Sequence, residues 1–174
     1  TATVGVYDIS AASATGSGLT NYSISYVNGH DTVKVAPLTI TASNQSKVYG
    51  LAQNLGTTAF TTTTLYNGNT VSAVTLTSLG SPATATVGVY DISAASATGS
   101  GLSNYSISYV SGHDTVKVAP LTITAKDQSK VYGTTFTFAG TEFTPSTLYN
   151  GDKVNSVTLT SAGASSSAVV ANSP

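Results

Sequence analysis

Cysteine, methionine and tryptophan are absent from the 174 residues of this chain, and only 7% of its residues are charged. Without cysteine there is no disulfide, no thiolate nucleophile and no cysteine–zinc site. The positive charges are six lysines, because arginine is absent as well. Nucleic-acid binding depends on clustered cations that displace counterions from phosphates, and scattered lysines do not provide them. We therefore expect no nucleic-acid partner.

Long hydrophobic runs and helical periodicity are also missing. No stretch approaches the roughly 18 consecutive apolar residues of a membrane span, so we expect no membrane insertion. There is no signal peptide and no initiating methionine, and we interpret the chain as an excised fragment. No window repeats apolar residues at the spacing of an amphipathic helix, which argues against helices in general.

The dominant positive feature is an internal repeat with a fixed offset of 83 residues. The segment VGVYDI at residues 4–9 returns unchanged at residues 87–92. Of residues 1–50, only four differ from their partners in residues 84–133, which leaves 46 identities. Repeats of this kind are typical of long arrays in which each module packs on its neighbours. We therefore predict an architectural role.

Polar and apolar residues alternate between the turns, which predicts β-strands. Tyr105, Ile107 and Tyr109 share one face of such a strand, and these residue types suit a pleated surface. We predict an all-β, mainly antiparallel chain of tandem β-grasp-like or small β-sandwich modules in an elongated rod. The expected strands of one module are residues 38–42, 47–50, 58–62, 73–77, 85–94, 105–110 and 114–118.

Asparagine and glycine mark the predicted turns. Asn28-Gly29 and its counterpart Ser111-Gly112 predict a tight hairpin between the last two strands of a module, because Asn-Gly favours positive φ angles. A second Asn-Gly turn is predicted at residues 67–68 and again at 150–151.

Two other segments predict a loop and a joint. The segment ATGSG, at residues 14–18 and 97–101, predicts a loop that leads into one helical turn. Pro37 and Pro120 each separate two strand-like runs, and proline cannot donate to a central strand ladder. We therefore predict module joints at the prolines. Joints this short favour a stiff rod over a flexible string.

The two copies diverge most over residues 51–57 and 134–140. Gln53 stands where Phe136 does, and an unpaired amide buried in a core costs about 1–3 kcal/mol. We therefore predict a peripheral edge or loop, with a variable recognition surface as the alternative.

Histidine occurs once per repeat, in the pairs His30-Asp31 and His113-Asp114. A zinc centre needs three or four protein ligands, so we interpret each pair as part of a solvated turn. Solitary aspartates such as Asp8 lack the alternating oxygen ligands of a calcium-binding loop. We predict no metal site and no cofactor, with calcium at a module joint as the alternative.

Lys47 and Lys130 recur in the segment SKVYG. A buried lysine that faces an asparagine beside a carboxylic acid can form an isopeptide bond. The competing interpretation is a lysine on the solvent face of an edge strand, where its charge opposes aggregation. Hydrolytic catalysis is not expected, because the chain has no Gly-x-Ser-x-Gly elbow and no phosphate-binding glycine loop. We predict no catalytic residues and no enzymatic activity.

Several of these segments together resemble the MBG (YGX-type) repeat family, close relatives of the YDG repeats of bacterial adhesins. The resemblance implies β-grasp-like modules in tandem, a bacterial cell-surface or secreted location, and a stalk or adhesive role without catalytic residues. One departure is that GHDTVKV stands where the family often has NGTLTV. The segments that carry the resemblance are LTITA, KVYG (47–50 and 130–133), the Asn-Gly turn, VGVYDI (87–92) and NYSISYV (104–110).

The resemblance also implies where a module begins. If modules start at Leu38 and Leu121, residues 1–36 form the C-terminal half of a repeat, 37–119 a complete repeat, and 120–174 the N-terminal half of the next. Ordered halves would then complement each other between neighbouring chains, or the polymer would continue beyond the fragment. Solvent-facing side chains at Val4, Val6 and Ile9 would argue against complementation. Self-contained modules at 1–83 and 84–166 are the competing division.

We expect a structural repeat of a bacterial surface or secreted fibre, with neighbouring repeats or copies of the same protein as partners. The alternative is an adhesin module that binds carbohydrate or a host protein, stacking sugars on Tyr22, Tyr26, Tyr105 and Tyr109. An exposed row of tyrosines would favour that alternative, whereas buried rings would favour a scaffold. A further alternative is a filament subunit that assembles by strand complementation.

Overall fold

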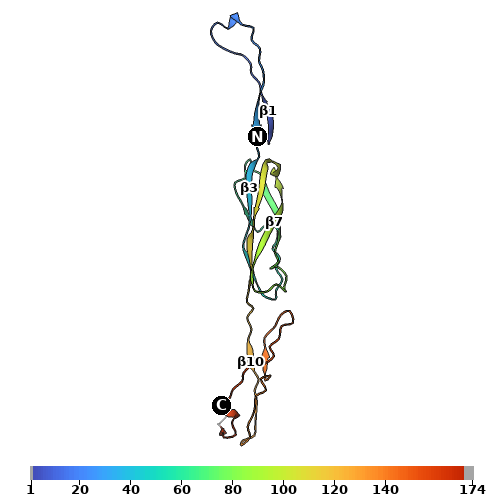
Figure 1. The fold of residues 1–174 in the computed structure, drawn as a ribbon, viewed down its shortest axis with the longest axis vertical. Coiled ribbons are helices and arrows are strands. Elements are labelled where there is room, and N and C mark those ends of the chain that lie inside the picture. Colours follow the sequence, from blue (N-terminus) through green and yellow to red (C-terminus); the bar gives the residue numbers. More distant parts are fainter. Residues whose placement is uncertain (1, 171–174) are drawn as a thin grey trace.

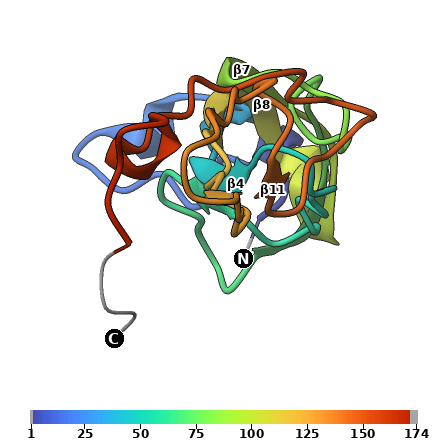
Figure 2. The ribbon, with the colours of Figure 1, turned by 90° about the horizontal axis from the view of Figure 1, so that it is seen from below.

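The chain forms a long, narrow rod in the computed structural model, which describes residues 2–170 (Figure 1). Three parts follow one another along the rod: an N-terminal segment (2–35), a central unit (36–117) and a C-terminal segment (118–170). Viewed from below, the parts overlie one another within a narrow cross-section (Figure 2). The N-terminal segment holds β1 (Gly5–Ile9), the 3-10 turn η1 (Leu19–Asn21) and β2 (Gly29–Val33). The C-terminal segment holds β10 (Ile123–Ala125), β11 (Phe143–Pro145) and η3 (Ala162–Ala164).

The central unit contains two sheets, with strand orders β5-β3-β8 and β4-β9-β7-β6. Parallel pairs join β3 to β8 and β4 to β9, and the remaining pairs are antiparallel. The long strand β7 pairs with β9 through its first residues and with β6 through its last. Its elements are β3 (Ala36–Ala42), β4 (Gln45–Val48), β5 (Phe60–Thr62), β6 (Thr70–Thr77), β7 (Gly88–Ser100), η2 (Leu102–Asn104), β8 (Tyr105–Val110) and β9 (Gly112–Lys117).

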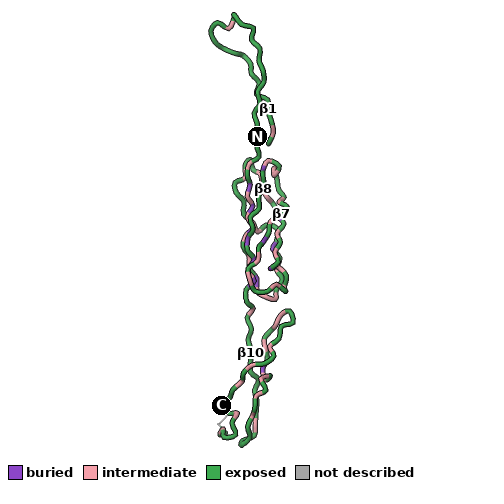
Figure 3. The backbone as a smooth tube through the Cα atoms, in the orientation of Figure 1, coloured by how far each residue is buried: buried purple, intermediate pink, exposed green. Residues whose placement is uncertain are grey.

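The core lies between these sheets and needs both ends of the unit's sequence. Ile40 of β3, Val74 of β6 and Tyr105 of β8 belong to one buried cluster. Ala42 of β3 and Ile92 of β7 belong to a second. Burial of each isoleucine or leucine side chain stabilises the fold by about 1.5–3 kcal/mol. Because the clusters combine side chains from early and late strands, this burial holds the two ends of the unit's sequence together. Burial is concentrated in the central unit (Figure 3).

The predicted all-β class is confirmed, and the strands β3 to β9 overlap all seven expected segments. The single helical turns predicted near Asn21 and Asn104 are confirmed as η1 and η2. The sheets are more mixed than predicted, because two of the strand pairs in the central unit are parallel. Among residues 2–170 there is no helix whose length and apolar character would let it cross a membrane.

Identical sequences form strands only where a partner strand lies beside them. The hexapeptide YSISYV is β8 at residues 105–110, next to β3, whereas residues 22–27 have the same sequence and no strand. Residues 97–100 likewise extend β7, because β6 pairs with Thr98–Ser100. The loop predicted at 97–101 is therefore wrong for its first four residues. Strand propensity depends on the neighbouring strand more than on the local sequence.

The hairpin predicted at Ser111-Gly112 is wrong. β8 pairs with β3, whereas β9 pairs with β7 and β4, so the chain changes sheets at Ser111. Gly112 does not adopt a positive φ angle. A Cβ atom on Gly112 would instead lie 2.5 Å from the carbonyl oxygen of Ala42. The glycine thus allows a close backbone approach rather than a tight turn.

The structure tolerates Pro37 inside a strand. Pro37 lies in β3 and is the register partner of Ser106 in β8, whereas β5 pairs only with residues 40–42. β3 therefore has a neighbour on one side only at Pro37, where a missing ladder donor is harmless. The predicted Asn-Gly turns are confirmed, with positive φ angles at Asn67 and Asn150. The division into 1–36, 37–119 and 120–174 stays a prediction.

Candidate functional site at the joints between units

The C-terminal segment contacts the central unit through the Asn-Gly turn at residues 149–152. Asn150 Nδ2 donates to the Ala83 carbonyl at 3.0 Å. The Tyr49 hydroxyl donates to Asp152 Oδ2 at 2.9 Å. The rings of Tyr49 and Tyr149 meet edge to face, with centroids 6.4 Å apart and planes at 89°. This geometry suits the aromatic quadrupoles, so hydrogen bonds and a ring contact hold the joint together.

Gly50 makes room for this contact. Its φ angle is +87°, and a Cβ atom there would lie 2.0 Å from Cγ of Tyr149. Gly133 occupies the same repeat position with φ +84°, yet a Cβ there would meet no described atom within 4 Å. Both glycines satisfy the left-handed backbone, but only Gly50 also lets a tyrosine ring lie against the chain.

The N-terminal segment contacts the central unit at the end of η2. The N–H of Val4 donates to Asn104 Oδ1 at 3.0 Å. A cavity of about 380 Å³ lies between the two parts, and the Asn-Gly turn at residues 67–68 lies on the central-unit side of this joint. The Asn-Gly turn therefore lies near both joints, but direct contacts of its side chains are seen at the second joint. Residues that line the cavity include Val4, Lys34, Tyr66, Asn67, Asn69 and Asn104.

The tyrosines proposed for sugar stacking do not form an exposed row in the central unit. Tyr105 is buried, and its hydroxyl accepts hydrogen bonds from the N–H of Tyr66 at 2.7 Å and from Asn69 Nδ2 at 3.3 Å. Tyr109 is 39% exposed, and its hydroxyl accepts from the N–H of Ala97 at 2.9 Å. Tyr22 and Tyr26 remain exposed in the N-terminal segment. In the central unit these rings brace the scaffold.

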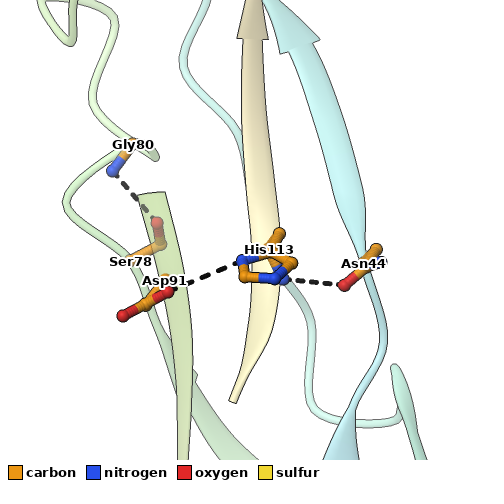
Figure 4. Close-up of polar contacts among 5 residues, drawn as sticks. All are labelled: Asn44, Ser78, Gly80, Asp91 and His113. Atoms are coloured by element: carbon orange, nitrogen blue, oxygen red, sulfur yellow. Dashed lines mark hydrogen bonds and ion pairs between the residues drawn. The ribbon is translucent and has the colours of Figure 1, made fainter. Parts of the chain in front are cut away.

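The two histidines pair with aspartates on a neighbouring strand rather than with the next residue. His113 Nδ1 lies 3.5 Å from Asp91 Oδ1 across the β7–β9 ladder (Figure 4). The N–H of His113 donates to Asn44 Oδ1 at 2.8 Å. His30 Nδ1 and Asp8 Oδ1 repeat this contact at 3.2 Å. The turn interpretation is thus wrong, because both histidines lie in strands, β2 and β9.

Lys47 is buried, so its predicted place on a solvent face is wrong. Its Nζ donates to the carbonyl oxygens of Leu51 at 2.8 Å and Ser81 at 3.4 Å, and to that of Pro82. These acceptors are backbone carbonyls and not the asparagine that an isopeptide bond requires. Lys130 repeats the arrangement, donating to the Thr134 carbonyl at 2.7 Å. The lysine therefore fastens two loops to β4.

Asp114 is fully buried beside the same loop, and its carboxylate oxygens have no hydrogen-bond partner among the described residues. Asp114 and His113 face opposite sides of β9, since successive strand residues alternate. Residues 2–170 contain no group of three or more histidine, cysteine or acidic side chains that could hold a metal ion. At the joint, the carboxylate of Asp152 accepts a hydrogen bond from the Tyr49 hydroxyl.

The variable segment is only partly peripheral. Gln53 is half-buried and its Nε2 donates to Gln45 Oε1 at 3.0 Å, but Leu55 is buried in the second core cluster. The prediction of a peripheral loop is therefore wrong for Leu55. Sequence reasoning also missed the joint residues Tyr49, Gly50 and Tyr149. The repetition of Tyr-Asn-Gly at residues 66–68 and 149–151 was the available signal, because an identical turn in each repeat can meet an identical neighbour.

Fold and joints together define an all-β unit of two packed sheets that contacts its sequence neighbours end to end. Residues 38–113 match the family model of the MBG domain, YGX type, which confirms the resemblance over this segment. The MBG family consists of non-catalytic repeat domains, and the match indicates a repeat module of the kind found in surface proteins. Neither a search of curated proteins nor a search of solved structures gave a match.

Proposed function

We propose that the chain is a structural repeat of a bacterial cell-surface or secreted fibre or adhesin, where it acts as a stalk element without catalysis. The MBG match supports the repeat character of residues 38–113. Buried tyrosine and lysine side chains of the central unit brace its backbone, which is what a load-bearing scaffold requires.

The observation that carries the proposal is the joint at Tyr49, Gly50 and Tyr149. Neighbouring parts of the rod meet through side chains placed by the fold, rather than through a free linker. A glycine whose Cβ would collide with the ring of Tyr149 indicates a fitted contact. A joint of this kind limits bending, so that many repeats in series project a terminal domain over a long distance.

Small-angle X-ray scattering from the dilute chain tests the proposal. We expect the distance distribution of a stiff rod. Tyr49→Ala removes the ring contact and the hydroxyl bonded to Asp152, so its distribution should broaden and shorten. Tyr132→Ala is the matched control, because Tyr132 holds the same repeat position and is 67% exposed. A compact particle, or equal broadening by both variants, would contradict the proposal.

A further inference from the structure

The sheet edges of the central unit are the places where an extended strand from elsewhere can join the fold. The end segments offer no such argument, since Val4, Val6 and Ile9 are exposed and argue against complementation there. An edge strand presents unpaired N–H and C=O groups to any strand that lies beside it. In the central unit the edge strands are β5 and β8 in one sheet, and β4 and β6 in the other.

Three of these edges have features that discourage pairing with another chain. β5 is three residues long and β4 is four. The pairing of β6 with β7 shifts register twice, between Val71 and Ala73 and between Ala73 and Thr75. Short strands and bulges are common protection for a sheet edge. β8 has neither, because Tyr105–Val110 pairs with β3 over six consecutive residues and contains no charged residue and no proline.

Backbone groups of β8 point away from β3 at alternate residues. The N–H of Thr39 donates to Thr63 Oγ1 at 3.0 Å and its carbonyl accepts from the N–H of Thr63 at 3.0 Å, on the β5 side of β3. Leu38 therefore directs its N–H and C=O toward β8, because successive residues of a strand bond on opposite sides. Its register partner Ile107 then directs its own N–H and C=O to the far side of β8, as do the residues two positions before and after. Among the described residues no other strand pairs with β8.

The side chains of β8 form a palindrome. Residues 105–109 read Tyr-Ser-Ile-Ser-Tyr, the same in both directions. When two copies of this strand lie antiparallel about Ile107, each tyrosine faces a tyrosine, each serine faces a serine and the two isoleucines face each other. Such like pairs are favourable across an antiparallel ladder, because aromatic rings pack together and hydroxyl groups share hydrogen bonds. The strand is therefore complementary to itself, which is what a twofold contact requires.

We propose that β8 pairs edge to edge with β8 of a second copy of the chain, antiparallel and with the twofold axis at Ile107. The outward N–H and C=O groups of the two strands then bond to each other, and two three-stranded sheets become one continuous sheet. Ser106 lies opposite Ser108 of the second copy, on the exposed face of this sheet. Because the strands of the central unit run along the rod, the two rods lie side by side (Figure 1).

A second copy suits this edge better than an unrelated strand does, because every residue of the palindrome meets its own kind. The segment YSISYV also occurs in both repeats, at residues 22–27 and 105–110. In an array of complete units, each unit therefore offers the same edge at regular intervals. One contact between two short strands buries little surface and is weak, but several contacts between the same two rods reinforce one another.

Edge pairing goes beyond the proposed stalk role, and the two fail differently. A rod-shaped chain that stays monomeric would overturn the edge pairing and leave the stalk role intact. A compact particle in the scattering experiment would contradict the stalk role, whatever the state of β8.

Sedimentation equilibrium at chain concentrations up to about 1 mM tests the pairing. The wild-type chain should form dimers. The double variant Ser106→Lys/Ser108→Lys places lysine opposite lysine at two points of the ladder, so it should dimerise at least about fivefold more weakly. Ser46→Lys/Ser93→Lys is the matched control, because it adds the same charge at exposed serines of β4 and β7, in the other sheet. The control should dimerise like the wild type.

A charge swap tests the register and separates repulsion from misfolding. Ser106→Lys/Ser108→Glu places each introduced lysine opposite an introduced glutamate when the axis lies at Ile107, so this variant should dimerise more tightly than the double-lysine variant. With the axis at residue 108, the glutamates would face each other and the gain would disappear. No gain over the double-lysine variant would contradict the register. A wild-type chain that stays monomeric would overturn the proposal and leave a strand of a different protein as the occupant of this edge.

Crosslinking checks the same register by distance, because the natural chain has no cysteine. Chains with Ser106→Cys and chains with Ser108→Cys are mixed in equal amounts in a glutathione redox buffer. The two introduced thiols lie on directly opposed residues, within the Cα separation that a disulfide allows. Two thiols at the same position are offset along the strands and lie further apart. The mixed disulfide dimer should therefore exceed its random share, and a random distribution of the three dimers would contradict the register.

Discussion

Gly112 shows how one residue type can serve different needs. Sequence patterns associate glycine in a tight turn with positive φ angles, and the repeat places Gly29 and Gly112 in the predicted hairpin turn. In the structure, Gly112 instead lies against the Ala42 carbonyl where the chain changes sheets. A steric requirement of this kind involves a residue 70 positions away, which no local pattern contains.

Replacement of Gly112 by alanine should therefore destabilise the central unit. A Cβ 2.5 Å from a backbone oxygen forces β3 and β9 apart, at a cost of about 1–3 kcal/mol. Gly29→Ala is the control, because a Cβ on Gly29 would lie 3.8 Å from Ile9, an ordinary contact. Chemical denaturation of both variants measures the difference. Equal stabilities would contradict the steric explanation.

For other residues, the local conformation was predictable from the sequence, but the interaction partner was not. The Asn-Gly turns follow from local backbone preference, and both are confirmed. The partner of His113 proved to be Asp91, because strand register places the two opposite each other across the β7–β9 ladder. The burial of Lys47 likewise depends on carbonyls from loops that are distant in sequence. Tertiary placement decided these contacts.

At the scale of elements, strand positions followed from alternation, whereas strand pairing did not. Each of the seven expected segments of the central unit overlaps a strand, because alternating residues suit a sheet with one buried face. The hairpin failed because β8 and β9 are consecutive in sequence but belong to different sheets. Residues 22–27 add the converse lesson, since a perfect strand sequence without a partner remains outside any sheet.

The loop before β11 contains a group that responds to acid. Backbone N–H groups hold the pKa of the Glu142 carboxyl below its ordinary value of 4.5, against the upward effect of desolvation. The N–H of Ala139 contributes most, followed by those of Glu142 itself, Gly140 and Thr141. The carboxylate accepts from Ala139 at 3.0 Å and from Gly140 at 3.0 Å. A lowered pKa means that this local stabilisation is complete above pH 4.5 and is lost as the pH falls through the lowered value.

An NMR titration should therefore show the amide signals of Ala139 and Gly140 shifting together, with a midpoint below pH 4.5. Glu142→Gln should remove the transition, because the amide does not titrate. The equivalent loop of the central unit has Ala59 at this position and should not respond. A midpoint at or above 4.5 would contradict the hydrogen-bonded carboxylate.

At the scale of the whole molecule, the rod depends on the joints. The repeat and the short connections predicted an elongated chain, and the rod is observed. The contacts that stiffen it were not predictable, because Tyr49 and Tyr149 lie 100 residues apart and occupy different repeat positions. Only the fold shows that the Asn-Gly turn of one unit reaches the Lys-Val-Tyr-Gly segment of the unit before it.

Gly50→Ala should loosen the second joint without unfolding either part. The added Cβ would displace the ring of Tyr149 and break its contact with Tyr49. Gly133→Ala is the matched control, because it carries the same strain of a positive φ angle and meets no described atom. NMR relaxation on the dilute chains should show faster, independent tumbling of the C-terminal segment in Gly50→Ala only. Identical relaxation in both variants would argue against the fitted joint.

The parallel pairing within the central unit determines how the rod responds to tension. Residues 36–41 run beside residues 105–110, and residues 45–48 run beside residues 114–117. The strand that enters the unit, β3, and the strand that leaves it, β9, thus each have a parallel partner within the unit. A pull on the two ends slides these strands lengthwise, so their hydrogen bonds must break together in shear instead of peeling apart one by one. We therefore expect the resistance of the unit to lengthwise tension to depend on these two parallel pairs more than on its core.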